Sequence, residues 1–286
     1  MARNPLERRY DDLVFCGGGT RCVWQGGFLS VFAPWIDPLR RINTVSAGTI
    51  SALGYVSDQA QGLRDLMCDV FDEIAKGPGN VSLRRKLSGG PFFIYESAYA
   101  EMVRRLMSAA GALDAVADGP EWTVHVTRRP RVGSYAAMVA YALDLRWNDT
   151  PHVTWPRHLG ARSVAVDMRA AARSGLEAVV ELTVAAGSTP PSFAQHYHEG
   201  IPVIDGGLVD NAACPPDGHP LVLLTRPYAG CADRGDRTYV RPSRPIAVNK
   251  MDFTNAEAIR GVWLQGEQDA RIFLEQHGHL GAPSTR

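Results

Sequence analysis

Short apolar runs alternate along this chain with stretches of helical periodicity. Residues 13–16 (LVFC) form the first run, and the triple glycine of residues 17–19 stops it abruptly. A helical stretch follows over about residues 23–33, residues 41–45 form the next apolar run, and residues 46–55 are rich in small side chains. Runs of this length that end in glycine predict buried strands, and the stretches between them predict helices. The alternation predicts an α/β fold with a mostly parallel central sheet.

The same alternation continues toward the end of the chain. Helical spacing recurs over residues 63–74, 102–113 and 255–277, strand patterns occupy residues 122–127, 201–204 and 221–224, and residues 135–145 fit either structure. No internal repeat, low-complexity tract or clear linker interrupts the pattern. We therefore expect one domain over residues 1–286, with its core roughly within residues 11–277.

The charges of the chain balance. Its 286 residues include 30 Lys and Arg and 30 Asp and Glu, so the formal net charge is +0. Non-specific nucleic-acid binding needs excess positive charge, so nucleic acid is not an expected partner. Charged residues near the N-terminus, among them Arg8, Arg9 and Asp11, interrupt any apolar leader. No apolar run approaches the ~20 residues that span a bilayer. We expect a cytoplasmic protein, with peripheral membrane contact as an option, and the oligomeric state stays open.

The cysteines argue against a structural framework of disulfides or metal. There are five, an odd number, and no CxxC pair occurs. This pattern predicts neither a disulfide scaffold nor a zinc site, so we expect no metal and no cofactor. Cys16, at the end of a predicted strand, is expected to be a buried apolar residue rather than a nucleophile.

Three short motifs carry chemistry, and the first is GGGTR at residues 17–21. Glycines without side-chain obstruction let backbone N–H groups turn toward an anion or a developing oxyanion. A tight strand-to-helix turn explains the same residues. The phosphate-binding patterns GxGxxG and GxxxxGK[ST] are not fulfilled.

The other two motifs place a hydroxyl and a carboxylate after predicted strands. In TVSAG, residues 44–48, Ser46 occupies the strand-to-helix turn that a nucleophile elbow requires, and Gly48 lets the turn close. A helix-capping serine is the alternative. In DGG, residues 205–207, Asp205 ends a strand, where sites in α/β proteins usually form. A simple Asp-Gly turn is the alternative there.

In this order the three motifs, GGGTRC, TVSAG and DGG, resemble those of the patatin-like phospholipase family, GGGxRG, GxSxG and DG[GA]. Residues 185–193 (AAGSTPPSF) are similar to the family's small-residue and proline loop, and residues 205–211 (DGGLVDN) extend the third motif. The resemblance covers roughly residues 11–277. It implies a three-layer fold with a mostly parallel central sheet flanked by helices.

The resemblance also implies a lipid acyl hydrolase that uses a serine–aspartate dyad and no metal. Ser46 would attack an ester carbonyl of a phospholipid or another acyl ester and form an acyl-enzyme. Asp205 would take the serine proton without an intervening histidine. An exposed aspartate is too weak a base for this, so we expect its site to be partly desolvated, which raises its pKa.

The glycine loop would then hold the oxyanion. By the resemblance, the oxyanion and substrate-binding residues are Gly17, Gly18, Gly19, Thr20 and Arg21. The backbone N–H groups of Gly18, Gly19 and Thr20 would donate to the tetrahedral intermediate. Arg21 would fix the loop or meet an anionic head group.

Two positions depart from the family pattern. Thr44 replaces the first glycine of the elbow, where a β-branched residue fits only in a strand conformation, so we expect strain rather than loss of the turn. Cys22 replaces the glycine after Arg21, and we expect its effect on packing. Two other functions stay open. One is an acyltransferase or thioesterase with the same nucleophile, because the elbow and the oxyanion loop serve both reactions equally well. The other, which the two departures motivate, is a catalytically impaired lipid-binding homologue.

Histidines keep a Ser–His–Asp arrangement open as an alternative. His196 and His198 lie shortly before Asp205. The remaining six are His125, His152, His158, His219, His277 and His279.

Residues 76–95 stand apart from the strand and helix pattern. Arg84, Arg85 and Lys86 lie between glycine–proline steps, and Phe92 and Phe93 follow. Such a segment is a surface connection or a mobile lid. A chain without net charge has no general attraction to an anionic membrane, so any contact needs a local patch. Our hypothesis for that patch is these three basic and two aromatic residues.

Overall fold

The computed structural model describes residues 10–36, 38–77, 79–88, 92–231 and 236–276. Several residues used in the sequence predictions lie outside this range. They are Arg8 and Arg9 near the N-terminus, residues 89–91 of the charged segment, and His277 and His279.

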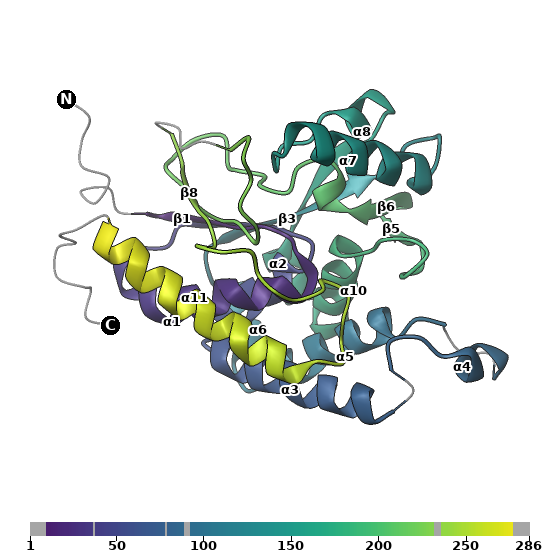
Figure 1. Cartoon of the computed structure of the whole chain (residues 1–286), viewed down its shortest axis with the longest axis horizontal. Helices are drawn as coiled ribbons and strands as arrows, with labels where there is room; N and C mark the ends of the chain where they lie inside the picture. Colours follow the sequence, from purple (N-terminus) through teal and green to yellow (C-terminus); the bar gives the residue numbers. More distant parts are fainter. Residues whose placement is uncertain (1–9, 37, 78, 89–91, 232–235, 277–286) are drawn as a thin grey trace.

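An eight-stranded sheet forms the centre of the described structure (Figure 1). Five strands run parallel in the order β8-β7-β1-β2-β3. Strands β4 and β6 pair antiparallel with β3, and β5 pairs antiparallel with β6. The strands are β1 (Asp12–Phe15), β2 (Arg41–Val45), β3 (Glu121–Arg128), β4 (Arg162–Asp167), β5 (His196–His198), β6 (Ile201–Asp205), β7 (Leu221–Leu223) and β8 (Thr238–Val240). The predicted α/β fold with a mostly parallel sheet is confirmed.

Helices occupy the stretches between most strands. They are α1 (Val23–Phe32), α2 (Gly48–Val56), α3 (Ala60–Lys76), α4 (Leu83–Leu87), α5 (Tyr95–Met107), α6 (Ala112–Ala117), α7 (Ser134–Asn148), α8 (Trp155–His158), α9 (Met168–Ser174), α10 (Leu176–Ala186) and α11 (Ala256–Gln276), with 3₁₀ turns η2 (Gly19–Cys22), η3 (Ala33–Trp35) and η4 (Gly206–Leu208). No helix among the described residues is both long and apolar enough to cross a bilayer.

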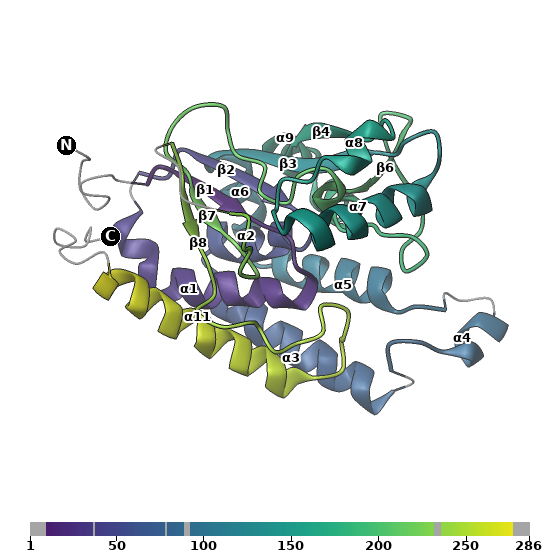
Figure 2. The same ribbon diagram turned by 45° about the horizontal axis from the view of Figure 1, so that its top comes forward.

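The structure changes or completes the helix and strand prediction in several places. The helical pattern over residues 102–113 is two helices, α5 and α6, because the chain turns at Gly111 with a left-handed φ of 78°. Residues 135–145, which fit either structure, are helical in α7. The charged segment contains the short helix α4, which stands out from the body of the molecule in both ribbon views (Figures 1 and 2). Strands β4, β5 and β8 were not predicted.

The two faces of the sheet carry cores of different size. Side chains alternate between faces along a strand, so Leu13 and Phe15 of β1 pack into the large cluster with the helices. Val14 and Cys16 pack into a smaller cluster that Tyr228 and Leu145 of α7 help to cover. Figure 2 shows α1, α3, α5 and α11 together on the first side of the sheet. The sheet therefore lies between a thick helical layer and a thinner one.

One edge of β3 positions the site. Strand β2 pairs with β3 as far as Val45, which lies opposite His125. Strand β6 pairs with the following residues of β3, beginning with Asp205 opposite Val126. Strand β4 holds the other edge over the same residues. Because β2 runs parallel to β3 and β6 runs antiparallel, the two strands point toward each other. Their C-terminal ends meet, and Ser46 directly follows Val45 there.

Candidate active site

Ser46 stands on a strained turn between β2 and α2. It is one of four described non-glycine residues with positive φ, at 53°, and is 8% exposed. A left-handed φ at a non-glycine residue costs conformational energy and is typical of a nucleophile elbow. Gly48 is required two residues later, since a Cβ there would lie 2.4 Å from the carbonyl oxygen of Phe15. The turn thus brings the serine against the end of β1.

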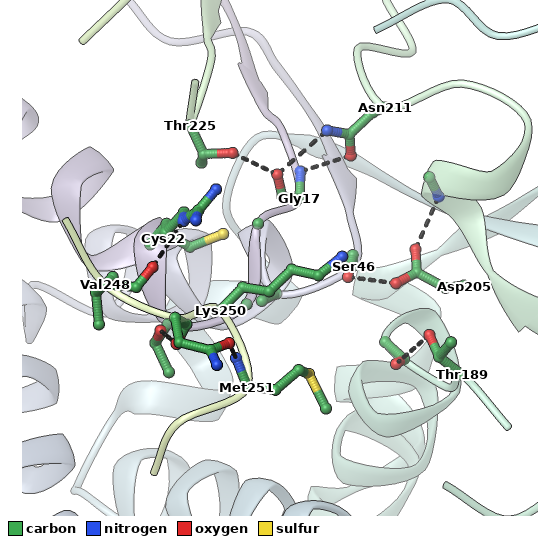
Figure 3. Close-up of a pocket in the computed structure, with 18 of the residues that line it drawn as sticks. Gly17, Cys22, Ser46, Thr189, Asp205, Asn211, Thr225, Val248, Lys250 and Met251 are labelled. Carbon is green, nitrogen blue, oxygen red and sulfur yellow. Dashed lines mark hydrogen bonds between the residues drawn. The ribbon is translucent and has the colours of Figure 1, made fainter. Parts of the chain in front are cut away.

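The side chain of Asp205 faces this serine directly (Figure 3). Ser46 Oγ donates a hydrogen bond of 2.6 Å to Asp205 Oδ2. The other carboxylate oxygen, Oδ1, accepts from the Gly207 amide at 2.8 Å, and the Asp205 amide donates to the Ser188 carbonyl at 2.7 Å. Ser188 belongs to the small-residue and proline loop. The backbone therefore fixes Asp205, and one oxygen remains for the serine.

Burial raises the pKa of the Asp205 carboxyl above its ordinary value, because desolvation disfavours the charged form. Hydrogen bonds from Ser46 and Gly207 and the positive charge of Lys250 act in the opposite direction but do not cancel the effect. A carboxylate with a raised pKa is a better proton acceptor. This is the direction that the sequence predicted.

The start of the glycine loop is clamped to the chain that follows Asp205. Gly17 N–H donates to Asn211 Oδ1 at 2.9 Å, and the Gly17 carbonyl accepts from Asn211 Nδ2 at 3.2 Å. Thr225 Oγ1 donates to the same carbonyl at 2.6 Å. Both polar groups of Gly17 are thereby used in holding the loop (Figure 3), and its N–H is not available to a ligand.

The end of the glycine loop is tied to residues 248–250. The Thr20 amide donates to the Lys250 carbonyl at 3.2 Å, and Arg21 Nε donates to the Val248 carbonyl at 3.0 Å. The prediction of Thr20 as an oxyanion donor therefore needs correction, because its N–H is already paired. Arg21 takes the first of its two predicted roles, since it fixes the loop. Among the described residues, no acceptor pairs with the N–H groups of Gly18 and Gly19.

Lys250 brings a positive charge to this site. Its side chain extends toward Ser46 (Figure 3), and its charge lowers the pKa of Asp205. Sequence reasoning missed this residue, although a signal existed. The chain contains only three lysines, Lys76, Lys86 and Lys250, against many arginines.

A cavity of about 940 Å³ opens beside Ser46 and Asp205. Its walls come from α2, α3, α5, α7, the loop after α10 and residues 246–253. The large apolar side chains among them are Ile50, Met67, Tyr99, Met102, Met138, Tyr141, Leu145, Phe193, Ile246, Met251 and Phe253. A mostly apolar cavity with a few convergent polar groups suits a ligand with a hydrocarbon chain.

The three motif segments also lie within the match to a known protein family. The sequence profile of the family described as patatin-like phospholipase matches residues 13–216, which include all three motifs. The chain belongs to the patatin-like phospholipase family. This membership supports, at the level of the family, a lipid acyl hydrolase.

Among solved structures, the chain is similar to VipD from Legionella pneumophila, with 10% sequence identity and a TM-score of 0.46, over 94% of this chain and 67% of that one. A search of curated protein sequences found no match.

The two departures from the patatin-like phospholipase motifs are both accommodated. Thr44 lies within β2, and its Oγ1 accepts from Trp122 Nε1 at 3.2 Å and from Thr49 Oγ1 at 3.1 Å. The positive φ falls on Ser46, so the strain expected at Thr44 lies two residues later. Cys22 is buried, and its thiol donates to the Cys16 carbonyl at 3.4 Å. Burial raises the pKa values of both cysteines, which keeps them as thiols.

The histidine-containing alternative finds no support in the described residues. None of the six histidines there lines the cavity, and the partner of Ser46 is the carboxylate itself. His152 bonds to Asp210 at 2.9 Å, and His196 lies 3.5 Å from Glu96. Likewise, the described part of the chain contains no group of three or more His, Cys, Asp or Glu residues placed to hold a metal.

Proposed function

We propose that this protein hydrolyses carboxylic esters of acyl lipids through a Ser46–Asp205 dyad. One observation carries the proposal, the 2.6 Å hydrogen bond from Ser46 Oγ to Asp205 Oδ2 at the wall of a large apolar cavity. A carboxylate with a raised pKa at hydrogen-bond distance fits the role of general base for a serine nucleophile.

In the first half-reaction, Ser46 Oγ attacks the ester carbonyl carbon while its proton passes to Asp205 Oδ2. The carbonyl oxygen becomes an oxyanion, and the N–H groups of Gly18 and Gly19, which have no acceptor among the described residues, would donate to it. Collapse of this intermediate breaks the bond to the alcohol oxygen, which takes the proton from Asp205. The acyl chain then remains on Ser46, and the apolar walls of the cavity suit it.

In the second half-reaction, a water molecule gives a proton to Asp205 and attacks the acyl carbonyl. The new intermediate expels Ser46 Oγ, which recovers the proton from Asp205. The products are a fatty acid and the free enzyme, and each step needs only these two side chains and the loop amides. An alcohol or thiol in place of water gives acyl transfer, so product analysis with added acceptor separates the two reactions.

The proposal is tested with p-nitrophenyl esters and a fluorophosphonate probe. Ser46→Ala should abolish labelling and lower kcat/KM by about 10³-fold or more, as for other serine hydrolases without their nucleophile. Ser97, an exposed serine on α5 outside the cavity, offers a matched control. Ser97→Ala should label and hydrolyse as the wild type does. Undiminished turnover by folded Ser46→Ala protein would refute the dyad.

A further inference from the structure

Helix α7 presents four large apolar side chains to solvent. Tyr135, Val139, Leu143 and Trp147 are 62%, 60%, 52% and 82% exposed. Each of these residues lies four positions after the previous one, so together they form one stripe on the helix surface. The stripe is about 18 Å long. A single exposed apolar residue is ordinary, but a contiguous stripe marks an interaction surface.

A second face of the same helix lines the cavity beside Ser46. Met138, Tyr141 and Leu145 contribute to its wall. In both ribbon views α7 lies at the outside of the molecule, next to α8 (Figures 1 and 2). The helix is therefore a wall with an apolar surface on each side, one toward the cavity and one toward solvent.

Three arginines lie in the segment that leads to the N-terminal end of α7. Arg128 ends β3, and Arg129 and Arg131 lie in the turn that leads to α7. All three are exposed and make no ion pair with any described residue. They border a hollow that also includes Leu159. The one acidic residue of α7, Asp144, is buried and accepts hydrogen bonds from the amides that begin α8. The exposed stripe thus has positive charge at its start and no exposed carboxylate along the helix.

We propose that this α7 surface, made of the stripe and the three arginines, docks on an anionic phospholipid membrane. Apolar and aromatic side chains with flanking basic residues are the composition of helices that lie in the membrane interface. The inference rests on the proposed function for the identity of the partner, since a lipid ester must reach the cavity that α7 walls. Docking through α7 places the cavity wall at the lipid surface, where an acyl chain is available.

The position of Trp147 makes docking measurable. Of the six tryptophans, Trp24, Trp122 and Trp263 are buried, whereas Trp147 is the most exposed. Vesicles that contain anionic phospholipid with brominated acyl chains should quench part of the tryptophan fluorescence. Trp147→Phe should remove most of the quenching, and Trp155→Phe on α8 is the matched control that should retain it. Quenching that persists unchanged in Trp147→Phe protein would overturn the proposal.

The affinity of docking is tested by co-sedimentation with anionic and with zwitterionic vesicles. We expect binding to anionic vesicles, and Val139→Ser with Leu143→Ser should weaken it about tenfold or more, because two apolar side chains are lost from the lipid contact. These residues do not line the cavity, so hydrolysis of a short soluble ester should stay unchanged. That readout separates a failure of docking from a failure of the proposed function.

Four outcomes would contradict docking through the α7 surface. The first is that the wild-type protein does not sediment with anionic vesicles, and the second is that the double variant binds them as the wild type does. The third is that only Arg84→Gln with Lys86→Gln on α4 loses binding, which favours the patch hypothesised from sequence. The fourth is a dimer in sedimentation equilibrium that the double variant dissociates, which assigns the stripe to a second copy of the chain.

Discussion

Asn211 pairs with both backbone groups of Gly17, accepting from its N–H at 2.9 Å and donating to its carbonyl at 3.2 Å. The amide of one side chain thus holds the glycine loop in the same way that a neighbouring strand would. Because the pair is buried, each group left without its partner costs about 1–3 kcal/mol. The geometry of the proposed oxyanion donors depends on this contact.

Asn211→Ala should therefore impair catalysis without removing the nucleophile. We expect kcat to fall about tenfold to a hundredfold, the scale of small misplacements at an active site, while the fluorophosphonate still labels Ser46 slowly. Asn211→Asp is the informative control, because it keeps the acceptor for Gly17 N–H and loses only the donor. The kcat of Asn211→Asp should lie between those of Asn211→Ala and the wild type. Equal kcat values for all three proteins would exclude a positioning role for Asn211.

Lys250 should set the pH dependence of activity. Its positive charge lowers the pKa of Asp205, so Lys250→Met raises that pKa further. The base is active when deprotonated, and the acidic limb of the kcat/KM profile should move to higher pH. Lys250→Arg keeps the charge and should leave the limb in place. A limb that is identical in the methionine variant and the wild type would remove Lys250 from the electrostatics of the site.

Asp205→Asn should stabilise the folded protein near neutral pH. Burial raises the pKa of this carboxyl on folding, so the folded state binds the proton more tightly than the unfolded chain. The free energy of unfolding therefore falls as pH rises from the pKa of Asp205 in the unfolded chain to its pKa in the folded protein. Above the folded pKa, the full cost of burying the ionised carboxylate is present. The variant should have a Tm a few degrees higher at pH 7, and the difference should shrink as pH falls toward that of an ordinary aspartate. An unchanged Tm at both pH values argues against a desolvated carboxylate.

Thr44→Val should destabilise the elbow. The valine has the same shape but cannot accept from Trp122 Nε1 or Thr49 Oγ1. We expect a loss of about 1–3 kcal/mol in the free energy of unfolding, measured in urea, because buried donors lose their acceptor. Thr44→Ser keeps the hydroxyl and should lose less. If the Thr44→Val and Thr44→Ser variants are equally stable, the hydroxyl of Thr44 has no structural role. Thr44 then only fills space at a position where the family pattern has glycine.

Elements with a strong local pattern could be predicted from the sequence. Strand β2 follows the run of residues 41–45, and α11 follows the apolar spacing of residues 255–277. Helix α7 stayed undecided because two of its faces are apolar, which blurs the difference between helical and strand periodicity. Strands β4 and β5 were missed because their side chains are only partly buried or exposed, so neither shows a long apolar run. In addition, β5 has only three residues, and β4 pairs with β3, which lies two helices earlier in the chain.

The geometry of the site was predictable only in part. Ser46 and Asp205 carry recognisable motifs, but their meeting depends on the direction of β6. The rule that sites lie at the C-terminal ends of parallel strands does not place Asp205, because β6 is antiparallel. Nor does any local pattern connect Thr20 to the Lys250 carbonyl, 230 residues later, or Asn211 to Gly17.

The edge of β3 that β2 and β6 share also affects when the site can form during folding. Ser46 and Asp205 are 159 positions apart and come together only where β2 and β6 both pair with β3. A growing chain therefore has no carboxylate beside Ser46 until residue 205 has been made and β6 has paired with β3. The pairing of β6 thus determines when the proposed dyad can form. The appearance of fluorophosphonate reactivity during refolding would report the pairing of β6 with β3.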